Sequence, residues 1–136
     1  MRKRTHPRRH RQSGQALVET ALMIWVIITV VFFIFELGWL MYTYSVLADA
    51  ANEGVRYAIV HSGGDPAGTQ ARVKTFAGAS MHDVSAIRVT VTAPDGDYTP
   101  PNRVRVTVAY AYIPVLPQFV WAPTMHSFAE GRMVAQ

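Results

Sequence analysis

The chain contains no cysteine, which excludes disulfide bonds and thiolate metal sites. Other patterns that carry chemistry are missing too. His61, His82 and His126 show no metal-ligand spacing, and no Ser-His-Asp set or pair of carboxylates has a supporting sequence context. The sequence DGD at 95–97 lacks the remaining ligands of a calcium loop and is better explained as a turn. We therefore expect no catalysis, no cofactor and no metal.

Acidic residues are absent from the start of the chain, where positive charge is concentrated. Six of the thirteen Lys and Arg residues lie in the first eleven positions, and the nine acids begin at Glu19. The rest of the chain contains seven basic and nine acidic residues, so the formal net charge is +4 with this tail and −2 without it. This distribution argues against a nucleic-acid-binding domain. A basic tail before an apolar run instead predicts an N-terminus held in the cytoplasm.

The next stretch, residues 20–35, contains no charge at all, and apolar residues resume after Glu36. As an α-helix, residues 16–42 would span roughly 40 Å, enough to cross a hydrocarbon core of about 30 Å. The many β-branched residues would favour a strand in water, but lipid requires the backbone to form its own hydrogen bonds and so favours a helix. Aromatic residues typical of the outer membrane interface follow: Trp39, Tyr42 and Tyr44.

Two kinds of leader cleavage can be considered. A secretory signal peptide is cut after its apolar region, and ADA at 48–50 has the small-x-small pattern, but the apolar region exceeds the usual ~7–15 residues. In prepilin-type leaders the cut precedes the apolar segment, the leader ends in glycine, and a glutamate stands fifth in the mature chain. Here Gly14 would end the leader, Gln15 would begin the mature chain, and Glu19 would be its fifth residue.

Glu19 needs a physical explanation because a carboxylate inside a membrane costs a few kcal/mol, about 2.5–3.5 at the centre of a helix. The free amine of Gln15 in a neighbouring chain could pair with it and set the axial register of a helical filament. Alternatively, Glu19 lies in the headgroup layer near a helix N-terminus, where the dipole favours an anion. For Glu36 the alternatives are an interfacial position and a polar contact with a partner helix.

The helix is expected to continue beyond the membrane as far as HSGGDP at 61–66. One face of this continuation is polar and includes an i,i+3 pair, Glu53 and Arg56. The other face carries Leu47, Ala51, Gly54, Val55 and Ala58. The small residues Ala51, Gly54 and Ala58 would let a sheet or another helix approach closely.

Residues 14–60 resemble the TadE-like family, membrane-anchored pseudopilins of the tight-adherence (Tad, or Flp) pilus systems. The resemblance rests on Gly14 with Glu19, on Glu36 with Gly38, and on AANEGVRYA at 50–58. It implies a non-catalytic minor pilin that takes part in assembly of a Tad or type IV-like pilus. The implied partners are a prepilin peptidase, Tad inner-membrane platform proteins, other pilin-like subunits and membrane lipid. Five residues are candidates for helix contacts during assembly: Glu36, Gly38, Ala51, Gly54 and Ala58.

The rest of the chain predicts a small domain. Residues 66–79 favour a short helix with Asp65 as its cap, Pro66 at its first position, and Val73, Phe76 and Ala77 turned inward. Alternating residues at 87–92 and 103–112 predict two strands, joined by turn residues as an antiparallel hairpin.

Residues 113–123 are expected to form a loop, because they include Pro114, Pro117 and Pro123. A third strand is predicted within 125–136, with Ser127, Ala129 and Gly131 packed under the small face of the long helix. The arginines of the exposed sheet face are explained by solubility: Arg88, Arg103 and Arg105.

We therefore predict an α+β, pilin-like fold with a basic leader at 1–14, a transmembrane and stem helix at 15–60, and an extracytoplasmic head at 61–136. The expected location is the bacterial inner membrane, crossed once with the N-terminus in the cytoplasm. One alternative is an uncleaved single-pass anchor whose head binds an envelope partner. Another is a secreted domain released after Ala50.

Overall fold

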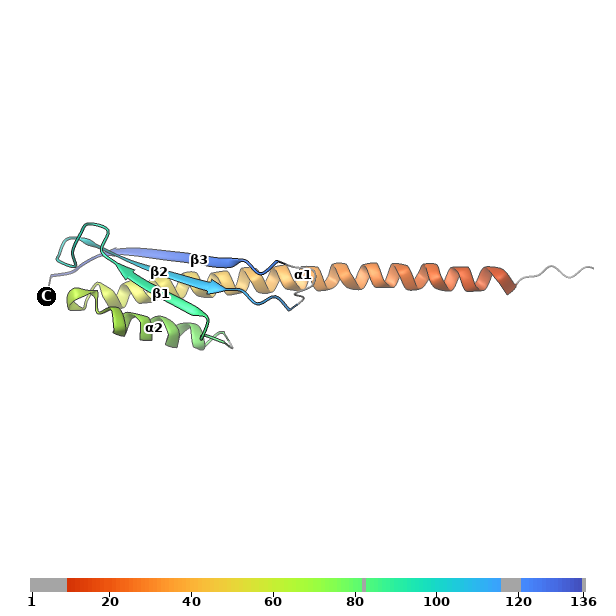
Figure 1. The fold of residues 1–136 in the computed structure, drawn as a ribbon, viewed down its shortest axis with the longest axis horizontal. Helices are drawn as coiled ribbons and strands as arrows, with labels where there is room; N and C mark the ends of the chain where they lie inside the picture. Colours follow the sequence, from red (N-terminus) through yellow and green to blue (C-terminus); the bar gives the residue numbers. More distant parts are fainter. Residues whose placement is uncertain (1–9, 82, 116–120, 136) are drawn as a thin grey trace, which may run out of the picture. The chain divides into compact units, whose positions relative to one another are not determined.

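The computed structural model describes residues 10–81, 83–115 and 121–135 and confirms the predicted α+β fold (Figure 1). Within these residues two α-helices and three strands follow one another: α1 (His10–Ala58), α2 (Pro66–Gly78), β1 (Ile87–Thr92), β2 (Arg103–Ala111) and β3 (Thr124–Arg132). The chain divides after Leu37 into two units, so that α1 contributes to both. The second unit, Gly38–Gln136, is called the head below.

Helix α1 begins at His10, four positions before the predicted cleavage glycine, and ends at Ala58. A short 3-10 helix, Ser62–Gly64, follows it, with Gly63 at a φ of 67° and Gly64 at a φ of 70°. This left-handed backbone favours glycine, which explains the predicted break at this point.

Helix α2 starts as its sequence predicts. The Asp65 side chain accepts a hydrogen bond from Gly68 N at 3.2 Å, and Pro66 occupies the first turn. The Tyr57 hydroxyl of α1 donates to Asp65 Oδ2 at 3.1 Å. The cap therefore also ties α2 to the end of α1.

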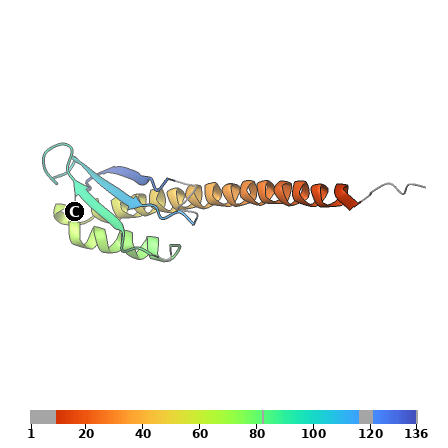
Figure 2. The same ribbon diagram turned by 45° about the vertical axis from the view of Figure 1, so that its right-hand side comes forward.

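The three strands form one antiparallel sheet in the order β1-β2-β3 (Figures 1 and 2). Val89 of β1 pairs with Val108, and Val106 of β2 pairs with Ala129. This register places the predicted apolar positions on one face, as the alternation requires. Strand β3 begins at Thr124, and its buried positions Met125, Ser127 and Ala129 confirm the predicted third strand.

The core of the head lies between this sheet face and the helices, and α2 lies against β1. Leu47, Ala51 and Ala58 of α1 are fully buried, as are Val104 and Val106 of β2. A Cβ added at Gly54 would lie 2.6 Å from a methyl group of Val73 and 3.1 Å from one of Val106. One added at Gly131 would lie 2.6 Å from a methyl group of Val55. The small face therefore admits both α2 and the sheet, as predicted.

Two details differ from the sequence predictions. Phe76, predicted to point inward, is 40% exposed, whereas Val73 and Ala77 are fully buried. Glu53 forms its ion pair with Arg72 of α2 at 2.6 Å, in place of the predicted pair with Arg56. Residues 38–58 of α1 belong to the same unit as the rest of the head, because their small face forms part of its core.

Candidate membrane anchor and assembly surface

The first part of α1 presents large apolar side chains outward in every direction. Between Leu17 and Phe35 these side chains are 44–72% exposed. Among the described residues, α1 is the one helix long and apolar enough to cross a membrane, with a mean hydropathy of 2.5 over its most apolar window. A helix that is apolar all round needs an apolar environment, because water penalises the exposed surface.

The polar side chains within this part of α1 are arranged in a way that suits lipid. The hydroxyl of Thr20 donates to Ala16 O at 2.8 Å, and that of Thr29 donates to Trp25 O at 2.9 Å. Further along α1, the hydroxyl of Thr43 donates to Trp39 O in the same way, at 2.9 Å. Each hydroxyl is thus satisfied inside the helix, as the absence of water in a bilayer requires.

The predicted processing residues lie on the helix surface. Gly14, Gln15 and Glu19 are all exposed. Together with Leu22, Met23, Val26 and Ile27, Glu19 lines a shallow surface hollow along one side of α1. Residues at i, i+3, i+4, i+7 and i+8 share a helix face, so the carboxylate stands at the N-terminal end of an apolar stripe. A second helix lying along this stripe would also meet Glu19.

Glu36 and Gly38 stand close together in sequence but in different surroundings. Glu36 is only 3% exposed and takes part in an interaction within the chain. At Gly38, an added Cβ would meet no atom of the described residues within 4 Å. The structure therefore accounts for Glu36 as a partnered buried acid, whereas packing within the described chain does not require a glycine at 38.

The three glycines of α1 differ in what they do for the fold. Glycine in the middle of a helix costs up to about 1 kcal/mol relative to alanine. At Gly54 the close approach of Val73 and Val106 explains this cost. At Gly14, as at Gly38, an added Cβ would meet nothing within 4 Å among the described residues. Both are therefore candidates for recognition by another molecule.

The other candidate contact residues are used inside the head. Ala51 and Ala58 are completely buried, and Gly54 is covered by α2 and β2. These residues do allow the close approach predicted for them, but the approaching elements belong to the same chain. Within the described chain the small face is therefore covered, whereas the apolar stripe around Glu19 is exposed.

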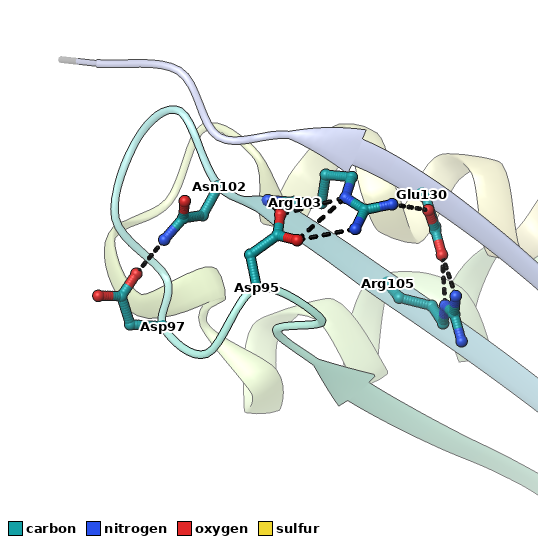
Figure 3. A network of polar contacts seen from close by, with 6 residues as sticks. All are labelled: Asp95, Asp97, Asn102, Arg103, Arg105 and Glu130. Carbon is teal, nitrogen blue, oxygen red and sulfur yellow. Dashed lines mark hydrogen bonds and ion pairs between the residues drawn. The ribbon is translucent and has the colours of Figure 1, made fainter.

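A network of charged residues lies along the start of β2 (Figure 3). Arg103 binds Asp95 with an Nη2 to Oδ1 distance of 2.7 Å, and its backbone N–H donates to Asp95 Oδ2 at 2.8 Å. Glu130 of β3 binds Arg105, the residue opposite it in the sheet, and also Arg103 at 3.5 Å. The Arg105 guanidinium also lies over the ring of Phe128, 5.3 Å from its centroid. These arginines are thus engaged by acids and a ring of the same sheet.

The loop between β1 and β2 is a turn, as its sequence predicts. Gly96 has a φ of 108° and donates to Ala93 O at 3.2 Å. The carboxylate of Asp97 accepts hydrogen bonds from Thr99 and Asn102, which lower its pKa. Hydrogen bonds from Arg103 lower the pKa of Asp95 from 3.8 to about 2.

The prolines of residues 113–123 predict a loop and indicate no role for it. In the structure Ile113, Val115 and Trp121 are 65%, 68% and 88% exposed. A sequence signal existed, because no Lys, Arg, Asp or Glu occurs from Val106 to Ala129. Residues 116–120 of this loop, and the basic residues 1–9 of the leader, lie outside the described part of the chain.

One helix of the described chain is long and apolar enough to cross a membrane, and it continues into a small α+β head, which suggests a membrane anchor. Residues 14–56 match the family model described as TadE-like protein, which confirms the resemblance seen in the motifs. The matched segment starts at Gly14 and includes Glu19, Glu36, Gly38 and Gly54. Curated proteins and solved structures gave no significant match.

Proposed function

We propose that the chain is a minor pilin of a Tad pilus, anchored in the bacterial inner membrane, which a prepilin peptidase processes between Gly14 and Gln15. Its role is structural, in assembly of the pilus together with other pilin-like subunits and the inner-membrane platform. The observation that carries the proposal is the exposed stripe of α1 that begins at Glu19. The family match over the same segment supports it.

The chemistry of assembly follows from two groups. Removal of residues 1–14 would create an α-amine at Gln15 and would discard six basic side chains. A carboxylate in lipid gains most from a cation that is also held away from water. The amine of one subunit and Glu19 of the next would form such a pair while their apolar stripes pack together. The pair would then select one axial register among many that apolar contacts alone would allow.

The mass of the mature N-terminus tests the processing step. Processing predicts a chain that starts at Gln15, an uncleaved anchor retains Met1, and secretion produces Ala51. Gly14→Val should leave the leader attached, whereas Gly38→Ala, a change at the other exposed helix glycine, should leave processing intact. A wild-type chain that keeps Met1 in cells with an active prepilin peptidase would refute the processing proposal.

The structure itself argues against release after Ala50. Val46, Leu47 and Ala50 belong to the core of the head, and Leu47 and Ala50 are fully buried. Cleavage after Ala50 would remove these side chains and expose the sheet face that they cover. The cost of losing one buried leucine is already about 2–5 kcal/mol, a large part of the stability of a small domain.

The register role of Glu19 is tested by incorporation into the filament or its assembly complex. Glu19→Ala should be inserted and processed but lose incorporation, because the terminal amine would lack its partner. Glu53→Ala makes the same chemical change on the surface of the head and should assemble normally. Normal incorporation of Glu19→Ala would show that Glu19 is merely tolerated in the headgroup layer.

A further inference from the structure

One end of the head carries exposed aromatic and aliphatic side chains from two separate segments of the chain. We call this set the apolar rim and define it by six residues: Trp39, Tyr42 and Tyr44 of α1, and Ile113, Val115 and Trp121 of the connection between β2 and β3. Their exposed fractions run from 46% at Tyr42 to 88% at Trp121. Exposed apolar side chains gathered in one place mark an interaction surface.

Contacts inside the head place the two segments at the same end. At the opposite end, Gly131 lies against Val55, and Val134 N donates to Ile59 O at 3.1 Å. From Gly131 back to Thr124, β3 runs about 23 Å at 3.3 Å per residue. From Val55 back to Tyr42, α1 runs about 20 Å at 1.5 Å per residue. The start of β3 is therefore level with Tyr42, and both ribbon views show the described ends of the β2–β3 connection, residues 112–115 and 121–123, beside this part of α1 (Figures 1 and 2).

The distribution of charge distinguishes the two ends of the sheet. Near the far end, Asp95, Arg103, Arg105 and Glu130 form the network of Figure 3. Towards the rim, the sequence from Val106 to Ala129 contains no Lys, Arg, Asp or Glu, and the charge that β1 adds at this end is the exposed Arg88 opposite Ala109, whose long side chain can reach lipid headgroups. Charged groups stay in water, whereas tryptophan and tyrosine favour the boundary between lipid and water. The head is thus suited to face lipid with its rim and water with its charged end.

We infer that the apolar rim rests on the surface of the bilayer that α1 crosses, with Ile113, Val115 and Trp121 inserted into the headgroup layer. The head starts at Gly38, three positions after Phe35, where the uncharged run ends, so the chain leaves the bilayer at this end of the head. The same membrane is therefore available to Ile113, Val115 and Trp121. The head is then held at two places, by α1 and by these three side chains, which restricts its tilt.

This inference rests on the membrane-anchor part of the proposed function and is independent of processing and filament formation. It is tested with the full chain in lipid nanodiscs, using tryptophan fluorescence and lipids brominated on the acyl chain near the headgroup. One variant keeps only Trp25 and another keeps only Trp121, the other tryptophans being replaced by phenylalanine. A third carries Val134→Trp as its sole tryptophan, at the charged end of the head, where residue 134 is 52% exposed.

The expected result is loss of emission from Trp25 and Trp121 in brominated lipid, with a blue-shifted spectrum and little quenching by acrylamide in the water. The Val134→Trp reporter should behave oppositely. Emission from Trp121 that survives brominated lipid but is quenched by acrylamide would overturn the inference and leave the anchor intact. Protection of Trp121 from both quenchers would also overturn it, because it would indicate a protein contact such as a second copy. Unquenched Trp25 would refute the anchor itself.

A second measurement leaves all three tryptophans in place. Because the chain has no cysteine, Val115→Cys and Val134→Cys each give one site for a spin label. In the same nanodiscs the label at 115 should collide more with oxygen, which concentrates in lipid, than with a water-soluble nickel complex. The label at 134 should show the reverse. Equal preference for the nickel complex at both sites would contradict insertion of the rim.

Discussion

Helix α1 has two parts that share one regular backbone and differ in what surrounds their side chains. Between Leu17 and Phe35 the apolar side chains are large and 44–72% exposed. Between Leu47 and Ala58 the inward side chains are mostly small and buried against α2 and the sheet. Side-chain size thus separates a surface open to lipid or to a neighbouring helix from a surface already occupied within the chain.

The comparison changes where an assembly surface can be sought. Small residues on a helix often allow two subunits to approach closely, and this was one prediction from Ala51, Gly54 and Ala58. In the structure this small face is covered by α2 and the sheet of the same chain, whereas the stripe beginning at Glu19 is exposed. Five experiments test this difference between the two parts of α1. Four of them concern the stability of the head and its charged residues.

The largest effect on stability is expected from truncating a buried leucine. Leu47→Ala should lower the free energy of unfolding of the head by about 2–5 kcal/mol, because Leu47 is completely buried. Leu22→Ala is the matched control, since Leu22 is 60% exposed in the other part of α1. Denaturant unfolding of the full chain in nanodiscs, followed by near-ultraviolet circular dichroism, measures both. Equal losses would mean that the two parts of α1 do not differ in this way.

Two glycine substitutions should change the free energy of unfolding in opposite directions. Gly54→Ala crowds Val73 and Val106, and overpacking of this kind costs about 1–3 kcal/mol, more than the roughly 1 kcal/mol gained in helix propensity. In Gly38→Ala the added Cβ would have no described atom within 4 Å, so the gain in helix propensity should stabilise the helix. The same unfolding measurement compares them. Stabilisation by Gly54→Ala would show that the core adapts to a methyl group.

Loss of filament incorporation by Gly38→Ala would assign that glycine to a contact between subunits. Such a result is expected if a neighbouring helix crosses α1 closely at this position, because packing within the described chain leaves the position open. Head stability should stay unchanged or rise slightly in the same variant. Normal incorporation would remove Gly38 from the candidate contacts.

A smaller effect distinguishes the observed partner of Glu53 from the predicted one. In a double-mutant cycle, Glu53→Ala with Arg72→Ala should show a coupling of about 0.2–1 kcal/mol, as exposed ion pairs do. Glu53→Ala with Arg56→Ala should show less, since Glu53 binds Arg72 at 2.6 Å. A larger coupling with Arg56 would restore the i,i+3 pair within α1.

The smallest effect is a pH dependence at the charged end of the head. Asp95 has its pKa lowered from 3.8 to about 2, chiefly by hydrogen bonds from Arg103. The fold therefore favours the ionised carboxylate, so its contribution to stability is complete above about pH 4 and is lost as the pH falls through about 2. Carboxyl resonances in NMR should show the low midpoint, and Arg103→Gln should raise it. An unchanged midpoint in Arg103→Gln would exclude this arginine as the cause.

Local patterns predicted much of the fold. Alternation of apolar residues located β1 and β2, because a strand with one buried face repeats every two residues. The pair Asp65 and Pro66 located the start of α2, because both act on the first helical turn. The family motifs between Gly14 and Arg56 could also be identified from the sequence alone.

Predictions were wrong where the answer depended on a partner distant in sequence. Phe76 lies on the flank of the stripe formed by Val73 and Ala77, and the width of that stripe depends on what covers α2. Arg72 reached Glu53 because the two helices pack together, which spacing along α1 could not reveal.

By itself, the sequence determined that α1 is a helix whose first part needs an apolar environment, because residues 20–35 carry no charge and the apolar stretch around them, 16–42, is long enough to cross a bilayer. It also determined the alternation of the strands, which is a property of consecutive residues. Tertiary structure decided which surfaces remain available. The small face of α1 is covered by the head, and the exposed side chains of the β2–β3 connection lie level with the aromatic residues of α1. Such outcomes depend on contacts between distant segments, which only the packed chain brings together.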